Sequence, residues 1–398
     1  MNMTRQDRGR FAVLCLLTGI DAAFVGCGPS PTPEPSTWPA VYFLPELYAG
    51  GQTVPAAVST DGKVVVGYCG EAAEDGRQQA FRWTKDGGMV GLGWLSGYED
   101  GSCAVATNTD GSIVVGLSSN ATTETAAAWV WTAETGMRAI PVPEGTIGSE
   151  ANDVADDGTV VGAYTQRQDD GTLWQAPFLW SQANGFLSLD GWGGDPDLAT
   201  MLPAAIAADG FSLVLDRRES DAVDASGVTR GAWVAQFGGP FGQGLWAQYG
   251  VTPEDASTFY PTNGSCSDGA TTLGGFVTNS SDWVRPAVWT AAGGILPIAP
   301  GVTGRVWCVS PDGTMAGGGN GDAGTAFVWS PTLGFQNLIV FLEELDWLHG
   351  TDVVSAFAAN GGYPSNVHGI ADGNKRLVGT AGTSIFGNPC RGFVLDLP

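Results

Sequence analysis

Residues 56–67 read AAVSTDGKVVVG and residues 80–84 read AFRWT, and these two segments decide the fold. The Asp-Gly pair between two β-prone runs is typical of a hairpin, because glycine tolerates the positive φ that a tight connection needs. Phe81 and Trp83 lie two residues apart, so they share one face of a strand and can pack against a neighbouring sheet. The segments therefore predict a small antiparallel β unit.

The same unit recurs along the chain. Asp-Gly pairs that precede a short strand stand 44 to 60 residues apart, and units of about 40 to 50 residues built from short strands are typical of propeller blades. We predict an all-β, seven-bladed β-propeller, or six blades if the degenerate unit around Leu213 and Trp233 is not a blade. The seven aspartates are Asp61, Asp110, Asp157, Asp209, Asp268, Asp312 and Asp372. The recurring tryptophans, predicted to form the core between blades, are Trp83, Trp131, Trp180, Trp289 and Trp329.

The last unit is incomplete. It ends at residues 392–395, GFVL, without the apolar strand that follows the aromatic strand in the other units. The segment VYFLPEL at residues 41–47 has the composition to supply that strand. We therefore predict that the N-terminal strand completes the last blade and locks the ring, which would cover strand edges otherwise open to aggregation.

The repeats carry a family resemblance. The pattern A-x-S-x-D-G-x-V-V-V-G, followed by A-F-x-W-T and G-M-x-x-L, resembles the HAF family of bacterial extracellular repeat proteins, over nearly all of residues 41–398. The segment LIVFLEEL at residues 338–345 is similar to a short helical insertion that this family often places before its terminal repeat, which implies a helix near residues 336–349. The resemblance implies a surface location and brings no established activity or catalytic residue.

The N-terminus has the layout of an export signal. Three arginines precede the apolar residues 11–20, which are too few to span a membrane. The sequence FVGC at residues 24–27 resembles a bacterial lipoprotein box, so we expect residues 1–26 to be a lipoprotein signal peptide and Cys27 to be lipid-modified. An ordinary cleaved signal is the alternative, because Asp21 interrupts the apolar region.

Three segments follow from this reading. Residues 1–26 are the signal, residues 27–40 form a Pro-rich linker after lipidated Cys27, and residues 41–398 form the repeat domain. The lipid would tether the protein to a membrane, at the outer membrane or cell surface. If the lipoprotein box is not used, the protein would be secreted.

The composition excludes nucleic acid as a partner. Without residues 1–26, which hold three arginines and two aspartates, the chain has 14 basic and 39 acidic residues. The resulting field repels phosphate backbones. Sixty glycines and 15 tryptophans, with 15% charged residues, suit a turn-rich β protein rather than a helical bundle.

Five cysteines follow Cys27, and disulfides are permitted in an exported protein. The pairs nearest in sequence are Cys69 with Cys103 and Cys266 with Cys308, while Cys390 is left over. Spacing does not fix the connectivity, and each cysteine is equally explained as a small buried apolar residue.

Aromatic residues outside the repeat register offer the best candidate ligand contacts. Loop aromatics with nearby Asp and Asn are typical of carbohydrate binding, through stacking and directional hydrogen bonds. The alternative is that they cap the ends of the ring. A polysaccharide or a surface protein would be the partner. The candidates are Trp94, Trp192, Phe241, Trp246 and Tyr249.

Nothing in the sequence predicts a catalytic, metal or cofactor site. The two histidines, His349 and His368, have no ligand partner at metal-site spacing. The best acidic cluster is Asp153, Asp156 and Asp157, whose spacing is not that of an EF-hand calcium loop. We expect no cofactor and read the chain as a binding or scaffolding module. The rival reading is a polysaccharide lyase or hydrolase with its site at the channel mouth, built from several blades.

Overall fold

The computed structural model describes residues 40–398 except 71–76, 190–200, 211, 218–230, 238–244, 251–257, 267–270, 279–283, 300, 321–323, 361 and 383–389. The proposed signal, Cys27 and most of the linker lie outside these residues, as do the turn at Asp268 and the candidates Trp192 and Phe241.

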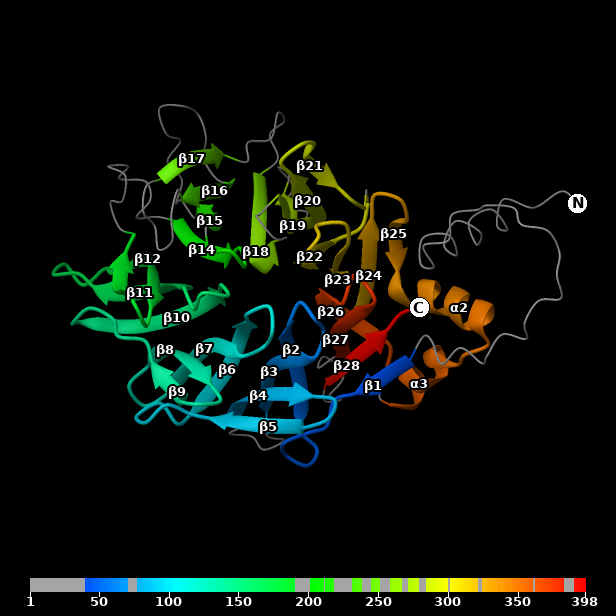
Figure 1. Ribbon diagram of the computed structural model, residues 1–398, viewed down its shortest axis with the longest axis horizontal. Helices are drawn as coiled ribbons and strands as arrows, with labels where there is room; N and C mark the ends of the chain where they lie inside the picture. Colours follow the sequence, from blue (N-terminus) through cyan, green and yellow to red (C-terminus); the bar gives the residue numbers. More distant parts are fainter. Residues whose placement is uncertain are drawn as a thin grey trace, which may run out of the picture.

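In the described part of the chain the strands fall into seven sets of four, which follow one another around a common centre (Figure 1). The first three sets are β2 (Gln52–Val58), β3 (Val64–Gly70), β4 (Gln78–Thr84) and β5 (Gly88–Gly93); β6 (Gly101–Thr107), β7 (Ile113–Asn120), β8 (Thr125–Thr132) and β9 (Gly136–Ala139); and β10 (Thr146–Val154), β11 (Val160–Arg167), β12 (Leu173–Ser181) and β13 (Gly185–Ser188).

Three further sets follow, and the last set includes the first strand of the chain. They are β14 (Met201–Ile206), β15 (Ser212–Arg217), β16 (Gly231–Phe237) and β17 (Leu245–Gly250); β18 (Thr258–Cys266), β19 (Thr272–Thr278), β20 (Val284–Thr290) and β21 (Gly294–Pro297); and β22 (Gly304–Val309), β23 (Ala316–Asn320), β24 (Thr325–Ser330) and β25 (Gly334–Asn337). The last set is β26 (Pro364–Ala371), β27 (Arg376–Ala381), β28 (Arg391–Asp396) and β1 (Ala40–Phe43).

Within each set the strands are antiparallel neighbours. The first three sets join into one sheet through single parallel pairs, Gln78 with Gly101 and Gly148 with Ala126. The degenerate unit of the sequence forms a set of its own, β14–β17.

A glycine in the second strand faces an aromatic ring in the third strand of most sets. The ring covers the bare glycine backbone, and a Cβ at Gly162 would lie 2.6 Å from the ring of Phe178. These rings are almost completely buried, and all but Phe393 lie two residues before a tryptophan that the sequence analysis predicted to form the core. The pairs are Gly67 with Phe81, Gly116 with Trp129, Gly162 with Phe178, Gly318 with Phe327 and Gly379 with Phe393.

The repeat tryptophans pack against the same cores but less deeply in two sets. Trp83, Trp180 and Trp329 are buried, whereas Trp131 and Trp289 are half-buried. The cores join neighbouring sets. One cluster packs Val115 of β7 with Val160 and Phe178 of the third set. Another packs Val65 and Phe81 of the first set with Val378 and Val394 of the last.

The first strand pairs with the last strand. Residues 40–43 of β1 run antiparallel to β28, with Val41 opposite Leu395. The N-terminal segment therefore lies where the sequence predicted a completing strand. Arg376 of β27 joins the last set to the first. Its guanidinium donates from Nε to Asp396 (2.5 Å) and from Nη1 to the carbonyl of Gly62 in the first set (2.6 Å).

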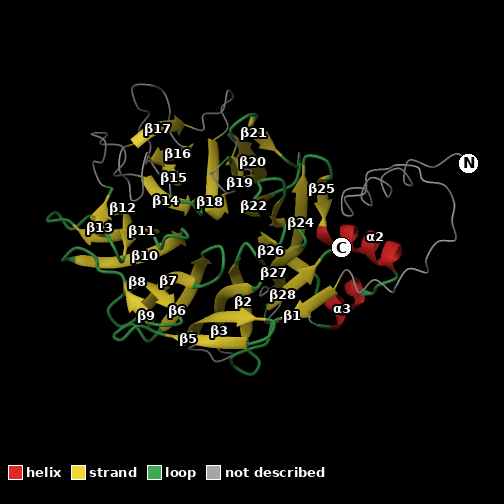
Figure 2. Ribbon diagram, viewed as in Figure 1, coloured by secondary structure: helices red, strands yellow, loops and turns green. Residues whose placement is uncertain are grey.

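The described residues include two helices, which lie on the outer side of the strand sets beside β25 and β1 (Figure 2). The helix predicted near residues 336–349 is confirmed as α2 (Leu338–His349), which begins after Asn337, whose side chain accepts a hydrogen bond from the backbone N–H of Ile339. The short helix α3 (Val353–Ala359) was not predicted. Its Phe357 packs edge-on against Phe43 and Phe393, at ring-centre distances of 5.4 and 5.0 Å.

The described cysteines are free. Cys69 and Cys103 do not form a disulfide, and Cys308 is a free buried thiol, so it is not bridged to Cys266, whose side chain is outside the described residues. Cys390 is also free. Burial raises the pKa of the Cys103 thiol to about 12, so this group is inert near neutral pH. The reading of Cys69 and Cys308 as small buried residues describes them correctly.

Candidate functional site

The innermost strands of the sets surround a central cavity. It has a volume of about 140 Å³ and is lined by residues in or next to β2, β6, β10, β14, β22 and β26. A space of this size holds on the order of ten waters or one small ligand. Its described lining contains no Lys, Arg or Tyr. The polar or aromatic lining residues are Thr60, Thr107, Asn108, Thr109, Asn152, Asp153, Trp307, Cys308 and His368.

A β-bulge in the innermost strands decides which side chains reach this cavity. The pairing of β2 with β3 skips Ala56, and that of β6 with β7 skips Val105. The same offset leaves Asn152, Trp307 and His368 unpaired in β10, β22 and β26. A bulge adds one residue and re-aims the side chains around it, and all five residues line the cavity. At the bulge position, three sets therefore carry a polar or aromatic residue where the first two sets carry alanine and valine.

Asp153 follows the bulge of β10 and brings a carboxylate to the cavity. Its Oδ2 accepts a hydrogen bond from the backbone N–H of Ile206 on β14 (3.0 Å), and its Oδ1 accepts one from Val154 (2.8 Å). Burial raises the pKa of Asp153 to about 7, and the two amide hydrogen bonds offset only part of that effect. A carboxyl group that titrates near neutrality inside a cavity is a candidate functional residue.

His368 and Trp307 come from β26 and β22. The Nε2 of His368 lies 3.3 Å from the hydroxyl of Thr380, and burial lowers the pKa of His368 to about 4, so the ring is neutral at pH 7. Trp307 is half-buried, and the guanidinium of Arg305 lies 5.7 Å from its ring centre and 4.5 Å from that of Phe276. Arg305 is not part of the cavity lining.

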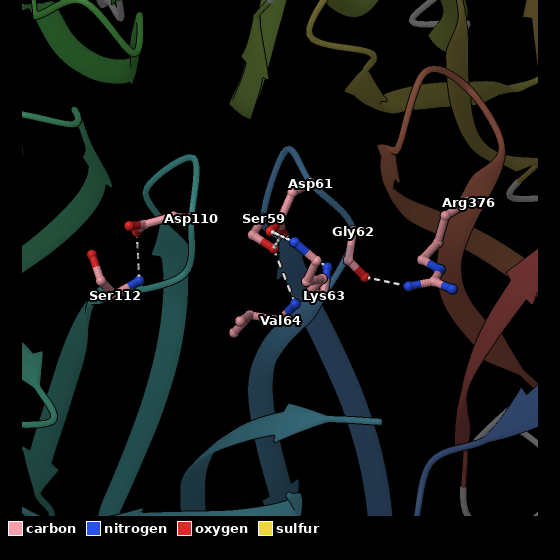
Figure 3. A network of polar contacts seen from close by, with 8 residues as sticks. All are labelled: Ser59, Asp61, Gly62, Lys63, Val64, Asp110, Ser112 and Arg376. Atoms are coloured by element: carbon pink, nitrogen blue, oxygen red, sulfur yellow. Dashed lines mark hydrogen bonds and ion pairs between the residues drawn. The ribbon is translucent and has the colours of Figure 1, made fainter. Parts of the chain in front are cut away.

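The Asp-Gly turns border one end of the cavity and are held by local hydrogen bonds (Figure 3). Ser59 donates to Asp61 (2.7 Å) and accepts from the backbone of Val64 (3.0 Å), while the ammonium of Lys63 pairs with Asp61 (2.8 Å). Burial acts to raise the pKa of Asp61, but the hydrogen bonds from Lys63 and Ser59 hold it below its usual value.

The neighbouring turn repeats the arrangement. The carboxylate of Asp110 accepts from the backbone of Ser112 (2.9 Å), and hydrogen bonds from Ser112 hold the pKa of Asp110 below its usual value (Figure 3). Thr60 and Thr109, which directly precede these two aspartates, line the cavity. Two turn carboxylates with a lowered pKa therefore directly follow residues of the cavity lining.

Of the predicted loop aromatics, Trp94 is described with its side chain, and it is not part of the cavity lining. Trp94 lies in the first set, donates its indole N–H to the carbonyl of Gln78 (2.8 Å) and lies 5.4 Å from the guanidinium of Arg77. Trp246 and Tyr249 lie on β17, the outer strand of the fourth set, and their side chains are outside the described residues. As ligand contacts they stay a prediction.

The acidic cluster of the sequence is divided among separate structural roles. Asp153 faces the cavity, Asp156 accepts from the backbone of Thr109 (2.9 Å) and Asp157 accepts from Thr159 (2.8 Å). Within the described residues no three His, Cys, Asp or Glu side chains are grouped to hold a metal ion. The described residues likewise contain no helix with the length and hydrophobicity to cross a membrane.

The sequence signal for the site was a departure from the repeat. Five residues before the turn aspartate, the units around Asp61 and Asp110 have alanine and valine, whereas those around Asp157 and Asp312 have Asn152 and Trp307. His368 escapes this count, because it lies four residues, and not five, before the turn aspartate of its set, Asp372.

Comparison with known proteins establishes the fold. No family model matches the sequence, and no curated protein sequence matches it. The β-propeller domain of the trilobed protease from Pyrococcus furiosus superposes with a TM-score of 0.52 at 8% identity, over 87% of this chain and 95% of that chain. A puromycin-hydrolyzing peptidase from Mycobacterium tuberculosis gives 0.50 at 13% identity, over 87% and 51%. TolB from Acinetobacter baumannii gives 0.45 at 13% identity, over 70% and 63%.

The fold is that of a β-propeller. At these identities the similarity concerns the fold alone. The chain spans about half the length of the mycobacterial peptidase and less than two thirds of TolB.

Proposed function

We propose that this protein is an exported, lipid-anchored β-propeller that acts as a binding or scaffolding module at the cell surface. The observation that supports a binding role is the central cavity, which is polar and whose described lining lacks the basic and phenolic side chains of a polysaccharide-cleaving site. The propeller domains with which the chain superposes supply the fold for such a module. We propose a polysaccharide or a surface protein as the partner.

We also propose that the seven sets are seven blades of a closed ring. Support comes from the pairing of β1 with β28 and from the core shared by Val65 and Val378 of the first and last sets. The hydrogen bonds of Arg376 to Asp396 and to Gly62 link the same two sets. The repeats also resemble those of the HAF family, which supports a bacterial surface protein of this kind.

The anchor is tested by lipid labelling. Cells that express the full chain are fed a radiolabelled fatty acid, and the Cys27→Ser variant serves as the comparison. We expect label and membrane association in the parent protein and neither in the variant. A parent chain that is exported but unlabelled would favour the ordinary cleaved signal.

The choice between binding and cleavage is tested on polysaccharides. Wild type and Trp246→Ala are applied to a glycan array, and the same polysaccharides are assayed for new reducing ends and for unsaturated products after incubation. The binding proposal expects retention that weakens in the variant, with no new ends. No retention on any glycan, with Trp246→Ala equal to wild type, would remove the carbohydrate partner. New chain ends would establish the enzyme instead.

A further inference from the structure

The central cavity has one charged group and no partner charge for it. Asp153 enters from β10, and the described lining has no lysine or arginine that could neutralise it. The only other titratable groups of that lining are His368 and Cys308. Cys308 is buried, with its sulfur 3.7 Å from the carbonyls of Gly317 and Val367, and burial raises the pKa of its thiol.

The carboxylate of Asp153 is oriented by backbone amides and has no lysine or arginine beside it in the described lining. The amides of Ile206 and Val154 fix both oxygens at 3.0 and 2.8 Å, which orients the group. Each carboxylate oxygen has two lone pairs, so acceptor capacity remains. Removal of such a group from water without a counter-ion is costly, and a bound cation would offset that cost.

The opposite wall is aromatic and uncharged. Trp307 at the bulge of β22 offers a ring face, and rings of this type attract cations. His368 at the bulge of β26 is neutral at pH 7, since burial lowers its pKa to about 4. β10 and the pair β22 and β26 lie on different sides of the central space in Figure 1. A ligand in the cavity would therefore meet a carboxylate on one side and a ring on the other.

The electrostatic field favours entry of a cation. The chain has a net charge of −24, and the turn carboxylates Asp61 and Asp110 directly follow the lining residues Thr60 and Thr109. The described cations nearby are already engaged: Lys63 pairs with Asp61, Arg376 pairs with Asp396, and Arg305 lies over the rings of Phe276 and Trp307 at 4.5 and 5.7 Å. Clefts bordered by one sign of charge concentrate ligands of the opposite sign.

We propose that the central cavity binds a small organic cation, a primary ammonium on a short aliphatic chain, with the ammonium on Asp153 and the methylene groups against Trp307. An inorganic cation fits less well, because calcium takes six to eight oxygen ligands and the described residues hold no group of three metal-binding side chains. This ligand is additional to the polysaccharide or protein partner of the proposed function. Its binding is measured in a separate experiment.

The test is calorimetric titration of the full chain, purified in detergent, with n-butylamine at pH 8. We expect saturable binding that is at least tenfold weaker in Asp153→Asn, which keeps the shape of the side chain and removes its charge. Asp156→Asn is the matched control, because it removes one charge at the neighbouring turn, where Asp156 bonds to the backbone of Thr109. That variant should bind within about twofold of wild type, since it alters only the long-range field.

The pH dependence gives a second readout. Alkylammonium groups stay protonated below about pH 10, so a loss of affinity on acidification reports the protonation of Asp153. Because the pKa of Asp153 is raised to about 7, the affinity should fall roughly tenfold for each unit below that pH. The described titratable and charged groups on the surrounding elements include Asp61 and Lys63 at the β2–β3 turn, Asp110 at the β6–β7 turn, Asp156 and Asp157 at the β10–β11 turn, Asp209 at the β14–β15 turn, Arg305 and Cys308 on β22, Asp312 at the β22–β23 turn, Asp372 at the β26–β27 turn and His368 across the cavity.

Three results would overturn the proposal. They are an absence of heat with millimolar n-butylamine at pH 8, equal weakening in the two variants, and displacement of the amine by equimolar calcium, which would identify an inorganic cation site. A melting curve of Asp153→Asn like that of wild type shows that the variant is folded. The glycan-array test of the proposed function is independent of these three results, because it measures binding of a different ligand.

Discussion

At the residue scale, a glycine of the second strand lies opposite an aromatic residue of the third strand in five of the seven sets. Gly162 faces Phe178, and an added Cβ would lie 2.6 Å from that ring and against the carbonyl of Glu150. We expect Gly162→Ala to lower the free energy of unfolding by about 1 to 3 kcal/mol, because an overpacked core must shift. Chemical denaturation measures the change.

Gly148→Ala is the matched control for that variant. It lies in the same set, and a Cβ there would have its nearest atom 4.0 Å away, on Thr165. Its stability should stay close to wild type. Equal destabilisation by both substitutions would mean that loss of backbone freedom, and not contact with the ring, is the cause.

Two cavity residues make opposite contributions to the pH dependence of stability. The pKa of Asp153 is raised to about 7, so the folded state holds an extra proton between about pH 4 and 7 and stability falls as the pH rises. The pKa of His368 is lowered to about 4, so between about pH 4 and 6.5 the unfolded state holds the extra proton and stability rises with pH. The two effects oppose each other in wild type.

When one of the two groups is removed, the pH dependence of stability should be that of the remaining group. The melting temperature of Asp153→Asn should rise from pH 4 to 6.5, and that of His368→Gln should fall over the same range. Melts in buffers of constant ionic strength without amines provide the measurement. Parallel profiles for the two variants would show that neither group titrates as described.

Sequence reasoning found the repeat residues and missed the cavity residues. Gly67 and Phe81 were part of the quoted motif, because the pairing of a glycine with an aromatic residue recurs in five of the seven sets. Trp307 and His368 are single departures from the repeat, and their placement depends on a bulge that adds one residue to the innermost strand. A bulge has no reliable sequence signature, so alternation along the strand does not reveal which side chain faces the centre.

At the element scale, Arg376 ties the last set to the first. Its partner Asp396 is 3% exposed, and Arg376→Met would leave that carboxylate buried without its counter-ion. We expect a loss of about 3 kcal/mol in the free energy of unfolding, as for other broken buried ion pairs. Urea denaturation measures it.

Lys63→Met is the comparison for Arg376→Met. The Lys63–Asp61 pair is a surface pair with Lys63 largely exposed, and such pairs contribute little to stability. Its melting temperature should be near that of wild type. If Lys63→Met were the more damaging substitution, the link between the first and last sets would not depend on Arg376.

The elements themselves were predicted to different degrees. The strands around Asp-Gly turns and the helix α2 were anticipated, since both rest on local patterns. The helix α3 was not, because VVSAFAA at Val353–Ala359 is a short apolar run whose helical state depends on the packing of Phe357 against Phe43 and Phe393. The fourth set kept its four strands although Leu215, opposite Trp233, replaces the usual glycine.

At the scale of the whole molecule, ring closure requires that residues at the two ends of the domain lie face to face. Val41 and Leu395 are opposite each other on β1 and β28. We expect Val41→Cys with Leu395→Cys to form an intramolecular disulfide under mild oxidation, because paired strands bring opposite Cβ atoms into bonding range. Peptide mass mapping identifies the bond.

Val41→Cys with Val394→Cys is the control, because adjacent strand residues point to opposite faces. This pair should remain reduced. A bond in the control, or only intermolecular bonds in the first variant, would contradict the strand pairing.

The period of the repeats predicted the arrangement of strands, but the side chains at the centre come from six different sets, which no single repeat contains.

The most direct measurement is a crystal structure of the protein grown with n-butylamine at pH 8. The account predicts seven four-stranded sheets around one channel, with the amine nitrogen within hydrogen-bonding distance of the Asp153 carboxylate and its chain against Trp307. Sheets arranged as an open sandwich or linear solenoid, or an amine bound elsewhere with the channel filled by water alone, would contradict it.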